Sequence, residues 1–193
     1  MLLVSHYLLS ATPIDFPKES VVLRINVAWI KDKKELLALL GKIKHDVYLD
    51  YPQGRSKPPK PKMTLGETIA VAHQFPHIKY FAVSNVEDPK AIFAIKSKLP
   101  AHIEVVPKIE TRLGVKNMQT IIRKLRTKYV MLDKEDLYID VNRNSKAFEK
   151  LVANARKKAY LEGVNILELH GVVFLPYKRV ISKNDLKIKS IMS

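Results

Sequence analysis

Short apolar or β-branched segments alternate with amphipathic helical segments along most of this chain. The predicted strands are Val21–Val27, Val47–Leu49, Lys79–Val83, Ile103–Ile109, Tyr129–Leu132 and Val164–Leu169. The helices predicted between them are Lys33–Lys44, Leu65–Gln74, Pro89–Lys98, Asn117–Arg126 and Ser145–Glu162. This alternation is typical of βαβ units and so of a parallel sheet covered by helices. We predict an α/β fold, either an open doubly wound sheet or a (β/α) barrel of the TIM type.

Length and composition narrow the class further. A chain of 193 residues suits one domain with a sizeable core. The chain has no cysteine, which excludes disulfides and thiolate chemistry and fits a cytoplasmic protein. The apolar segment Met1–Leu9 is too short to span a bilayer, and we expect a strand or packing arm there. No glycine-rich phosphate loop follows a predicted strand, which counts against a nucleotide-binding open sheet.

A lysine and two carboxylates are the most chemically informative residues at the predicted strand ends. Lys108 and Glu110 are two positions apart and so share one face of their strand, and Asp136 follows the next strand. If those strands are parallel, the three side chains open at one rim and form a divalent-metal and oxyanion site. The alternative is a surface Lys–Glu pair with a helix-capping aspartate. Other strand ends carry Arg24, Asn26, Asp50, Ser84, Asn85, Asp133, Glu168 and His170.

Seven short segments follow one another along the chain: Leu23–Asn26, Leu49–Asp50, Met63–Leu65, Ala82–Ser84, Lys108–Glu110, Gly114–Asn117 and Asp136–Leu137. In this order they resemble the barrel domain of pyruvate kinase over about residues 21–141. A second set of segments is Ile109–Thr111, Glu135–Leu137, Ala155–Ala159 and Glu162–Gly163. That set looks like the HpcH/HpaI aldolases and the citrate lyase β-subunit, which belong to the same phosphoenolpyruvate/pyruvate-binding superfamily.

The resemblance implies a small (β/α) barrel, formed by residues 1–193 as a single domain, and a metal-dependent activity. It implies that Glu110 and Asp136 bind Mg²⁺ or Mn²⁺, with a 2-oxo acid or its enolate on the metal. It assigns catalytic roles to Lys108 and Arg24. The substrate-binding residues that it suggests are Arg24, Asn26, Asp50 and Ser84.

The chain also departs from pyruvate kinase in identifiable places. A basic, proline-rich linker over residues 54–63 stands where that family has a lid domain, and a basic tail over residues 175–193 stands in place of a regulatory domain. Lys134–Tyr138 lacks the glycines that would approach a substrate carboxylate. We therefore expect a pyruvate kinase-like enzyme, acting on a phosphoenolpyruvate- or pyruvate-like acid, that is not a complete pyruvate kinase. A carbon–carbon lyase or aldolase is the alternative.

Barrel closure and net charge suggest partners. Eight strand–helix units usually need about 200–250 residues, so the barrel is expected to be incomplete unless Leu2–Leu9 and Val172–Phe174 close it. An uncovered parallel edge favours a homodimer. The excess of 34 basic over 19 acidic residues gives +15, which suits small anionic substrates. It also leaves open a non-catalytic scaffold that binds nucleic acid or another polyanion. The single tryptophan, Trp29, is expected to be buried.

Overall fold

The computed structural model of this chain describes residues 2–5, 21–54 and 58–168. Its strands are β1 (Leu2–Ser5), β2 (Val21–Asn26), β3 (Asp46–Tyr51), β4 (Ile78–Val83), β5 (Glu104–Ile109), β6 (Tyr129–Leu132) and β7 (Asn165–Glu168). Its helices are the 3₁₀ turn η1 (Val27–Trp29), α2 (Lys33–Lys42), α3 (Leu65–Ala72), α4 (Pro89–Lys96), α5 (Arg112–Leu125), α6 (Lys134–Asp140) and α7 (Ser145–Leu161). Strands and helices alternate, as the periodicity predicts.

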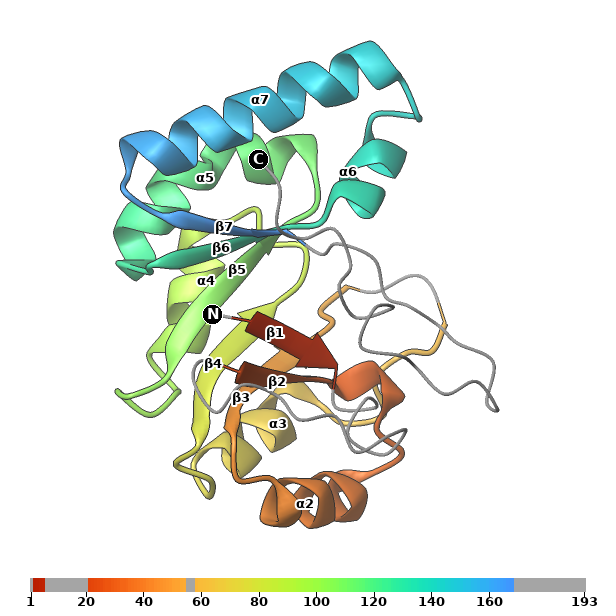
Figure 1. Cartoon of the computed structure of the whole chain (residues 1–193), viewed down its shortest axis with the longest axis vertical. Helices are drawn as coiled ribbons and strands as arrows, with labels where there is room; N and C mark the ends of the chain where they lie inside the picture. Colours follow the sequence, from red (N-terminus) through yellow and green to blue (C-terminus); the bar gives the residue numbers. More distant parts are fainter. Residues whose placement is uncertain (1, 6–20, 55–57, 169–193) are drawn as a thin grey trace.

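The seven described strands are all parallel, and they pair in sequence order from β1 to β7. Consecutive parallel neighbours with helical crossovers curl a sheet with its helices outside. Figure 1 shows this arrangement, with α2 and α3 at one end of the curl and α5 and α7 at the other. No ladder joins β1 to β7 in this part of the chain. The described residues form an incomplete (β/α) barrel, which confirms the fold-class prediction.

The curled sheet separates two apolar clusters. The larger one lies between the sheet and its helices and includes the fully buried Leu23, Leu36 and Phe81. The smaller one lies on the inner face of the sheet and takes one residue from each of five neighbouring strands: Val22, Tyr48, Ala82, Val106 and Met131. Successive side chains of a strand alternate between the two faces. The residue two positions beyond each member of the inner cluster therefore also points inward, at the carboxyl end of the sheet.

Two local predictions were wrong, and one helix was not predicted. Helix α5 begins at Arg112 rather than at Asn117, because the Thr111 hydroxyl accepts the Gly114 N–H and caps the helix. Helix α6 was not predicted, since its seven residues are mostly polar and show little periodicity. Trp29 is 50% exposed rather than buried. It sits at the end of η1, where the Asn26 side chain accepts the Ala28 N–H and turns the chain at the rim.

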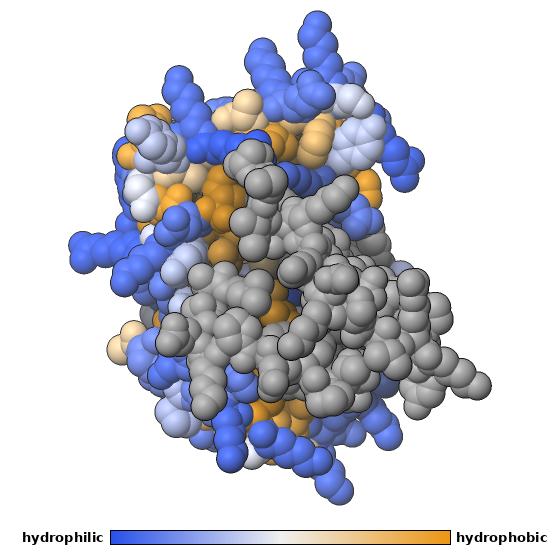
Figure 2. Space-filling model, in the orientation of Figure 1, coloured by the Kyte–Doolittle hydropathy of each residue, from blue (hydrophilic) through white to orange (hydrophobic). Residues whose placement is uncertain are grey.

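Some predicted features fall outside the described residues. These are Val172–Phe174, His170, the basic tail over residues 175–193, and residues 55–57 of the linker. The rest of that linker connects β3 to α3. No described helix is long and apolar enough to cross a membrane. Hydrophilic side chains project around much of the outline in Figure 2, in keeping with the net charge of +15.

Candidate metal centre and active site

A polar layer lies directly beyond the inner apolar cluster, at the carboxyl ends of the strands. Its members follow the cluster residues by two positions: Arg24, Asp50, Ser84, Lys108 and Asp133. Pleating gives them a common face, and the parallel pairing of β2 to β6 brings them to one rim. The sequence placed each of these residues at a strand end, and the structure shows that they form a continuous layer.

Asp50 and Lys108 lie at the centre of this layer and are almost fully buried, at 0% and 5% exposure. Arg24 donates to Asp50 Oδ2 from Nε at 2.9 Å and from a terminal nitrogen at 2.5 Å. The Lys108 ammonium lies 3.7 Å from the same oxygen and donates to the Ser84 hydroxyl at 2.9 Å. Asp50 thus serves as the counter-ion of two cations inside the barrel.

Glu110 continues the line of charges beyond Lys108. Its Oε1 lies 3.0 Å from the Lys108 ammonium, and its Oε2 accepts the Asn85 N–H at 3.0 Å. The residue is only 3% exposed. The predicted Lys–Glu pair is therefore present but buried, so the alternative of a surface pair is wrong.

Three carboxylates converge next to this pair. Glu110, Asp133 and Asp136 each offer an oxygen, and these oxygens all lie within 4.8 Å of one another. Asp133 also caps α6, because its side chain accepts the Asp136 N–H at 3.3 Å. The sequence predicted Glu110 and Asp136 as metal ligands but not Asp133. The signal for Asp133 was its place two residues after the inward-facing Met131.

Charge balance distinguishes the two buried carboxylates. Burial alone would raise the pKa of Asp50, but Lys108 and Arg24 outweigh it and hold that pKa below its usual value. Burial raises the pKa of Glu110, and the nearby Asp133 and Asp136 add to this effect while Lys108 opposes it. Burial would lower the pKa of Lys108, but Asp50 and Glu110 reverse this and keep the amine protonated.

The donor set suits a divalent cation. Among the described residues, four carboxylates (Asp50, Glu110, Asp133 and Asp136) are grouped with two cations, Arg24 and Lys108. Counted over these six side chains, the excess is two negative charges when all are ionised. A doubly charged ion would balance that excess. Carboxylate oxygens in such a group are the ligands that Mg²⁺ and Mn²⁺ prefer.

The remaining predicted substrate-binding residues have structural partners. The Asn26 side chain caps η1, and the Ser84 hydroxyl holds the Lys108 ammonium. Both belong to the same rim as the carboxylate cluster. The structure therefore brings together six of the seven predicted site residues in one network. The seventh, Asn26, lies two residues beyond Arg24 at the end of β2, and its side-chain oxygen accepts the backbone N–H of Ala28.

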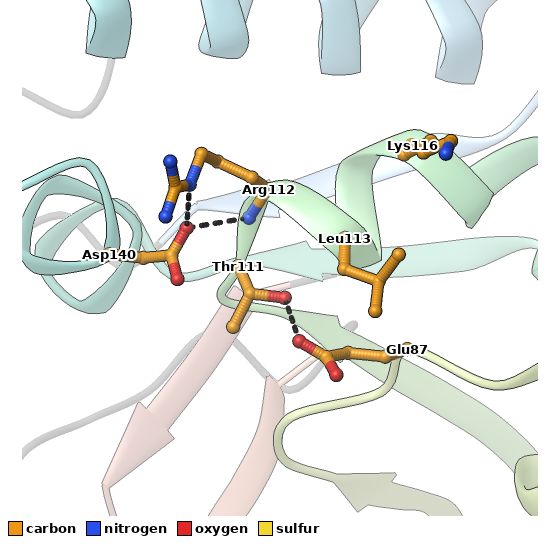
Figure 3. Close-up of a pocket in the computed structure, with 6 residues that line it drawn as sticks. All are labelled: Glu87, Thr111, Arg112, Leu113, Lys116 and Asp140. Carbon is orange, nitrogen blue, oxygen red and sulfur yellow. Dashed lines mark hydrogen bonds and ion pairs between the residues drawn. The ribbon is translucent and has the colours of Figure 1, made fainter.

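A separate pocket of about 390 Å³ opens beside the start of α5. Figure 3 shows that its polar groups are mutually paired: Thr111 donates to Glu87 at 2.5 Å, and Arg112 donates to Asp140 at 3.0 Å. With Lys116 added, its two cations match its two carboxylates. None of Glu110, Asp133 and Asp136 lines it. This charge-balanced pocket is therefore a weaker candidate for a functional site than the three-carboxylate cluster.

The chain matches no protein-family model and no curated protein sequence. Its fold is similar to that of citrate synthase SbnG, with a TM-score of 0.50 and 14% identity over 79% of this chain and 78% of that chain. A variant of the same enzyme gives a TM-score of 0.49 and 12% identity over 76% of this chain and 75% of that one. At these identities the likeness shows a shared barrel fold.

Proposed function

We propose that this protein is a divalent-metal-dependent enzyme that acts on a pyruvate-like 2-oxo acid through its enolate. One observation carries the proposal: the ammonium nitrogen of a buried lysine lies 3.0 Å from one carboxylate of a three-carboxylate cluster, at the carboxyl ends of parallel barrel strands. Active sites of (β/α) barrels lie at this end. The buried charges Asp50, Lys108 and Glu110 also point to a functional site, because isolated ionic groups are costly to bury.

Glu110, Asp133 and Asp136 would hold the metal. A bound Mg²⁺ or Mn²⁺ would supply Lewis acidity toward the 2-oxo and carboxylate oxygens of the substrate. The Asn85 N–H holds one oxygen of Glu110, and the Asp136 N–H in the first turn of α6 holds one oxygen of Asp133. Backbone N–H groups therefore orient two of the three proposed ligands, which favours a preorganised site.

Lys108 acts electrostatically in this proposal. An amine held protonated by two carboxylates is a poor nucleophile, so covalent Schiff-base chemistry is not its role. A fixed cation is suited to stabilising negative charge that develops on an enolate oxygen. Ser84 accepts one of its hydrogen bonds and thereby sets the direction of the ammonium.

The geometry around Arg24 favours carbon–carbon bond chemistry over phosphoryl transfer. Its guanidinium makes two hydrogen bonds to the buried Asp50, so these donors face a carboxylate of the protein itself. Phosphoryl transfer relies on cations that face the transferring group. The lyase alternative is also the one in keeping with a fold neighbour described as a citrate synthase. Phosphoryl transfer to or from an enol remains the second candidate, supported by the cationic Lys108.

The test is exchange of the pyruvate methyl protons into deuterated water, followed by proton NMR with Mg²⁺ or Mn²⁺. We expect exchange above a metal-only blank, and its loss in Lys108→Met. A matched control is Lys158→Met. Lys158 is a partly buried lysine outside the site, and its ammonium donates to two backbone carbonyls of α5. That variant should retain exchange. A protein that binds Mn²⁺ but gives no exchange above the blank would contradict the proposal.

Phosphorus NMR separates the two reaction classes. Phosphoenolpyruvate that stays intact with a nucleoside diphosphate, while pyruvate exchanges its protons, would favour bond formation or cleavage at carbon. Phosphate transfer to the nucleotide would instead favour the pyruvate kinase-like alternative.

A further inference from the structure

Trp29 is 50% exposed, and it is one of six large hydrophobic residues that the described part of the chain exposes. It is the chain's single tryptophan, and it lines an open groove of about 490 Å³ together with Pro58 and Pro59. Exposed apolar groups that gather in a groove with a polar rim mark interaction sites, whereas single exposed side chains are ordinary. The groove lies between the turn that follows β2 and the linker that precedes α3, so it belongs to the loops at the carboxyl ends of the strands.

The surroundings of the groove are strongly basic. Lys31 and Lys62 line it, Lys60 lies in the adjacent linker, and Lys33 and Lys34 begin α2; all five are exposed. The acidic residues of this segment are already engaged with backbone amides. Asp32 accepts the Glu35 N–H at 2.8 Å, and Glu35 accepts the Lys31 N–H at 2.5 Å. Glu67 on α3 also attracts Lys33, and it accepts the Thr64 N–H at 2.8 Å. Five ammonium groups therefore stand against three carboxylates, each of which accepts a backbone N–H at the start of a helix.

We propose that the Trp29 groove binds single-stranded nucleic acid, with a base stacked on the indole ring and the lysines near the phosphates. Aromatic rings framed by lysines bind unpaired bases with little sequence preference, because every base has a π-face. A double helix keeps its bases stacked inside, so it cannot offer a base to an indole. The charge of the groove is complementary to a polyanion, and the net charge of +15 supports attraction at longer range.

The proposed surface is distinct from the metal cluster and goes beyond the proposed enzymatic activity. The groove residues belong to η1, the start of α2 and the linker, whereas the metal ligands follow β5 and β6. Each proposal can therefore fail without the other.

Trp29 is its own reporter, since no other tryptophan contributes to the emission. The full-length protein is titrated with oligothymidylate of about ten nucleotides at low ionic strength, with EDTA present to remove metal-mediated contacts. We expect saturable quenching of the tryptophan emission. Binding of a fluorescein-labelled oligonucleotide, followed by anisotropy, then gives affinities for variants that lack the indole.

Trp29→Ala should weaken that binding by roughly tenfold or more, as expected for loss of one stacked base. The matched control is Tyr160→Ala, because Tyr160 is an aromatic residue that is 85% exposed at the far end of α7. It should bind like the unaltered protein. Circular dichroism checks that both variants are folded.

The lysines give a second, independent measurement. Replacing Lys31 and Lys62 together with glutamine should lower the slope of log affinity against log salt by about 1.4, at about 0.7 per phosphate contact on a single strand. The charge-matched control replaces Lys146 and Lys150, which are exposed on α7, and should leave the slope unchanged.

Four results would overturn the proposal. The first is no binding at low salt, and the second is binding that leaves the tryptophan emission and the Trp29→Ala affinity unchanged. The third is a mononucleotide that binds as tightly as the oligonucleotide, which would identify a small-ligand pocket. The fourth is an equal loss of oligonucleotide affinity when either lysine pair, Lys31 and Lys62 or Lys146 and Lys150, is replaced. That result would show diffuse attraction to the charged surface and would reject a site at Trp29.

Discussion

The Arg24–Asp50 ion pair allows a sharp test of how burial changes the contribution of a charge. Asp50 is fully buried, and its Oδ2 accepts two bonds from Arg24 while lying 3.7 Å from the Lys108 ammonium. Its Oδ1 has no hydrogen-bond partner among the described residues. In Asp50→Asn the amide oxygen can still face Arg24, but the new NH₂ group must then occupy the Oδ1 position. The substitution leaves two buried cations with one fewer counter-ion and adds an unsatisfied donor.

Removing one partner of a buried ion pair typically costs about 3–5 kcal/mol. We expect Asp50→Asn to lower the free energy of unfolding by that amount. With a slope of about 2 kcal/mol per M in urea, the midpoint should fall by roughly 1.5–2.5 M. Urea is preferred to guanidinium here because it does not screen charges.

The chain contains a matched control in Asp140→Asn. Asp140 accepts from Arg112 at 3.0 Å, but these side chains are 26% and 65% exposed. An exposed pair of this kind contributes about 1 kcal/mol or less. Urea unfolding followed by circular dichroism compares the two variants directly. If they lose equal stability, the argument that burial makes the Arg24–Asp50 pair costly to break is refuted.

Three further predictions concern the same rim. Because the pKa of Asp50 is below its usual 3.8, its stabilising charge is present above that pH and is lost as the pH falls through the folded-state pKa. The gap in urea midpoint between the unaltered protein and Asp50→Asn should therefore narrow between neutral pH and about pH 3, and a constant gap would contradict this. Asp133→Asn should weaken Mn²⁺ binding, measured by electron paramagnetic resonance, by roughly tenfold or more, because ligand charge sets affinity. Glu135 is an exposed residue of the same helical turn, and Glu135→Gln should leave Mn²⁺ affinity unchanged. If both substitutions weaken Mn²⁺ binding equally, Asp133 is not a metal ligand. Gly114→Ala places a Cβ 2.9 Å from a backbone oxygen of the loop after β4 and should cost about 1–3 kcal/mol of stability. In contrast, a Cβ added at Gly41 meets nothing within 4 Å, and Gly41→Ala should stabilise α2 by about 0.5–1 kcal/mol. If thermal unfolding shows Gly114→Ala to be the more stable of the two variants, this packing argument is refuted.

Local patterns were sufficient to identify most strands and helices of this barrel. The short apolar run of β5 and the helical stripe of α5 depend on which side chains leave water, and neighbouring residues in the sequence carry that information. The two-residue period of a strand placed Lys108 and Glu110 on one face, and this pairing is confirmed. Helix α6 was not predicted because a short, mostly polar helix shows almost no hydrophobic periodicity.

What the sequence determined by itself was the order of elements, the α/β class and the chemistry available at the strand ends. Only the tertiary structure decided which charges meet. The Arg24–Asp50 pair spans 26 positions, and the cluster that adds Asp133 to Glu110 depends on how β5 and β6 pair. The structure also decided that Lys108 is buried and Trp29 is half exposed, the reverse of what their residue types favour. The physical reason is that the burial and the electrostatic partners of a side chain depend on how distant strands and helices pack together. Periodicity records only which face of a single strand or helix is apolar.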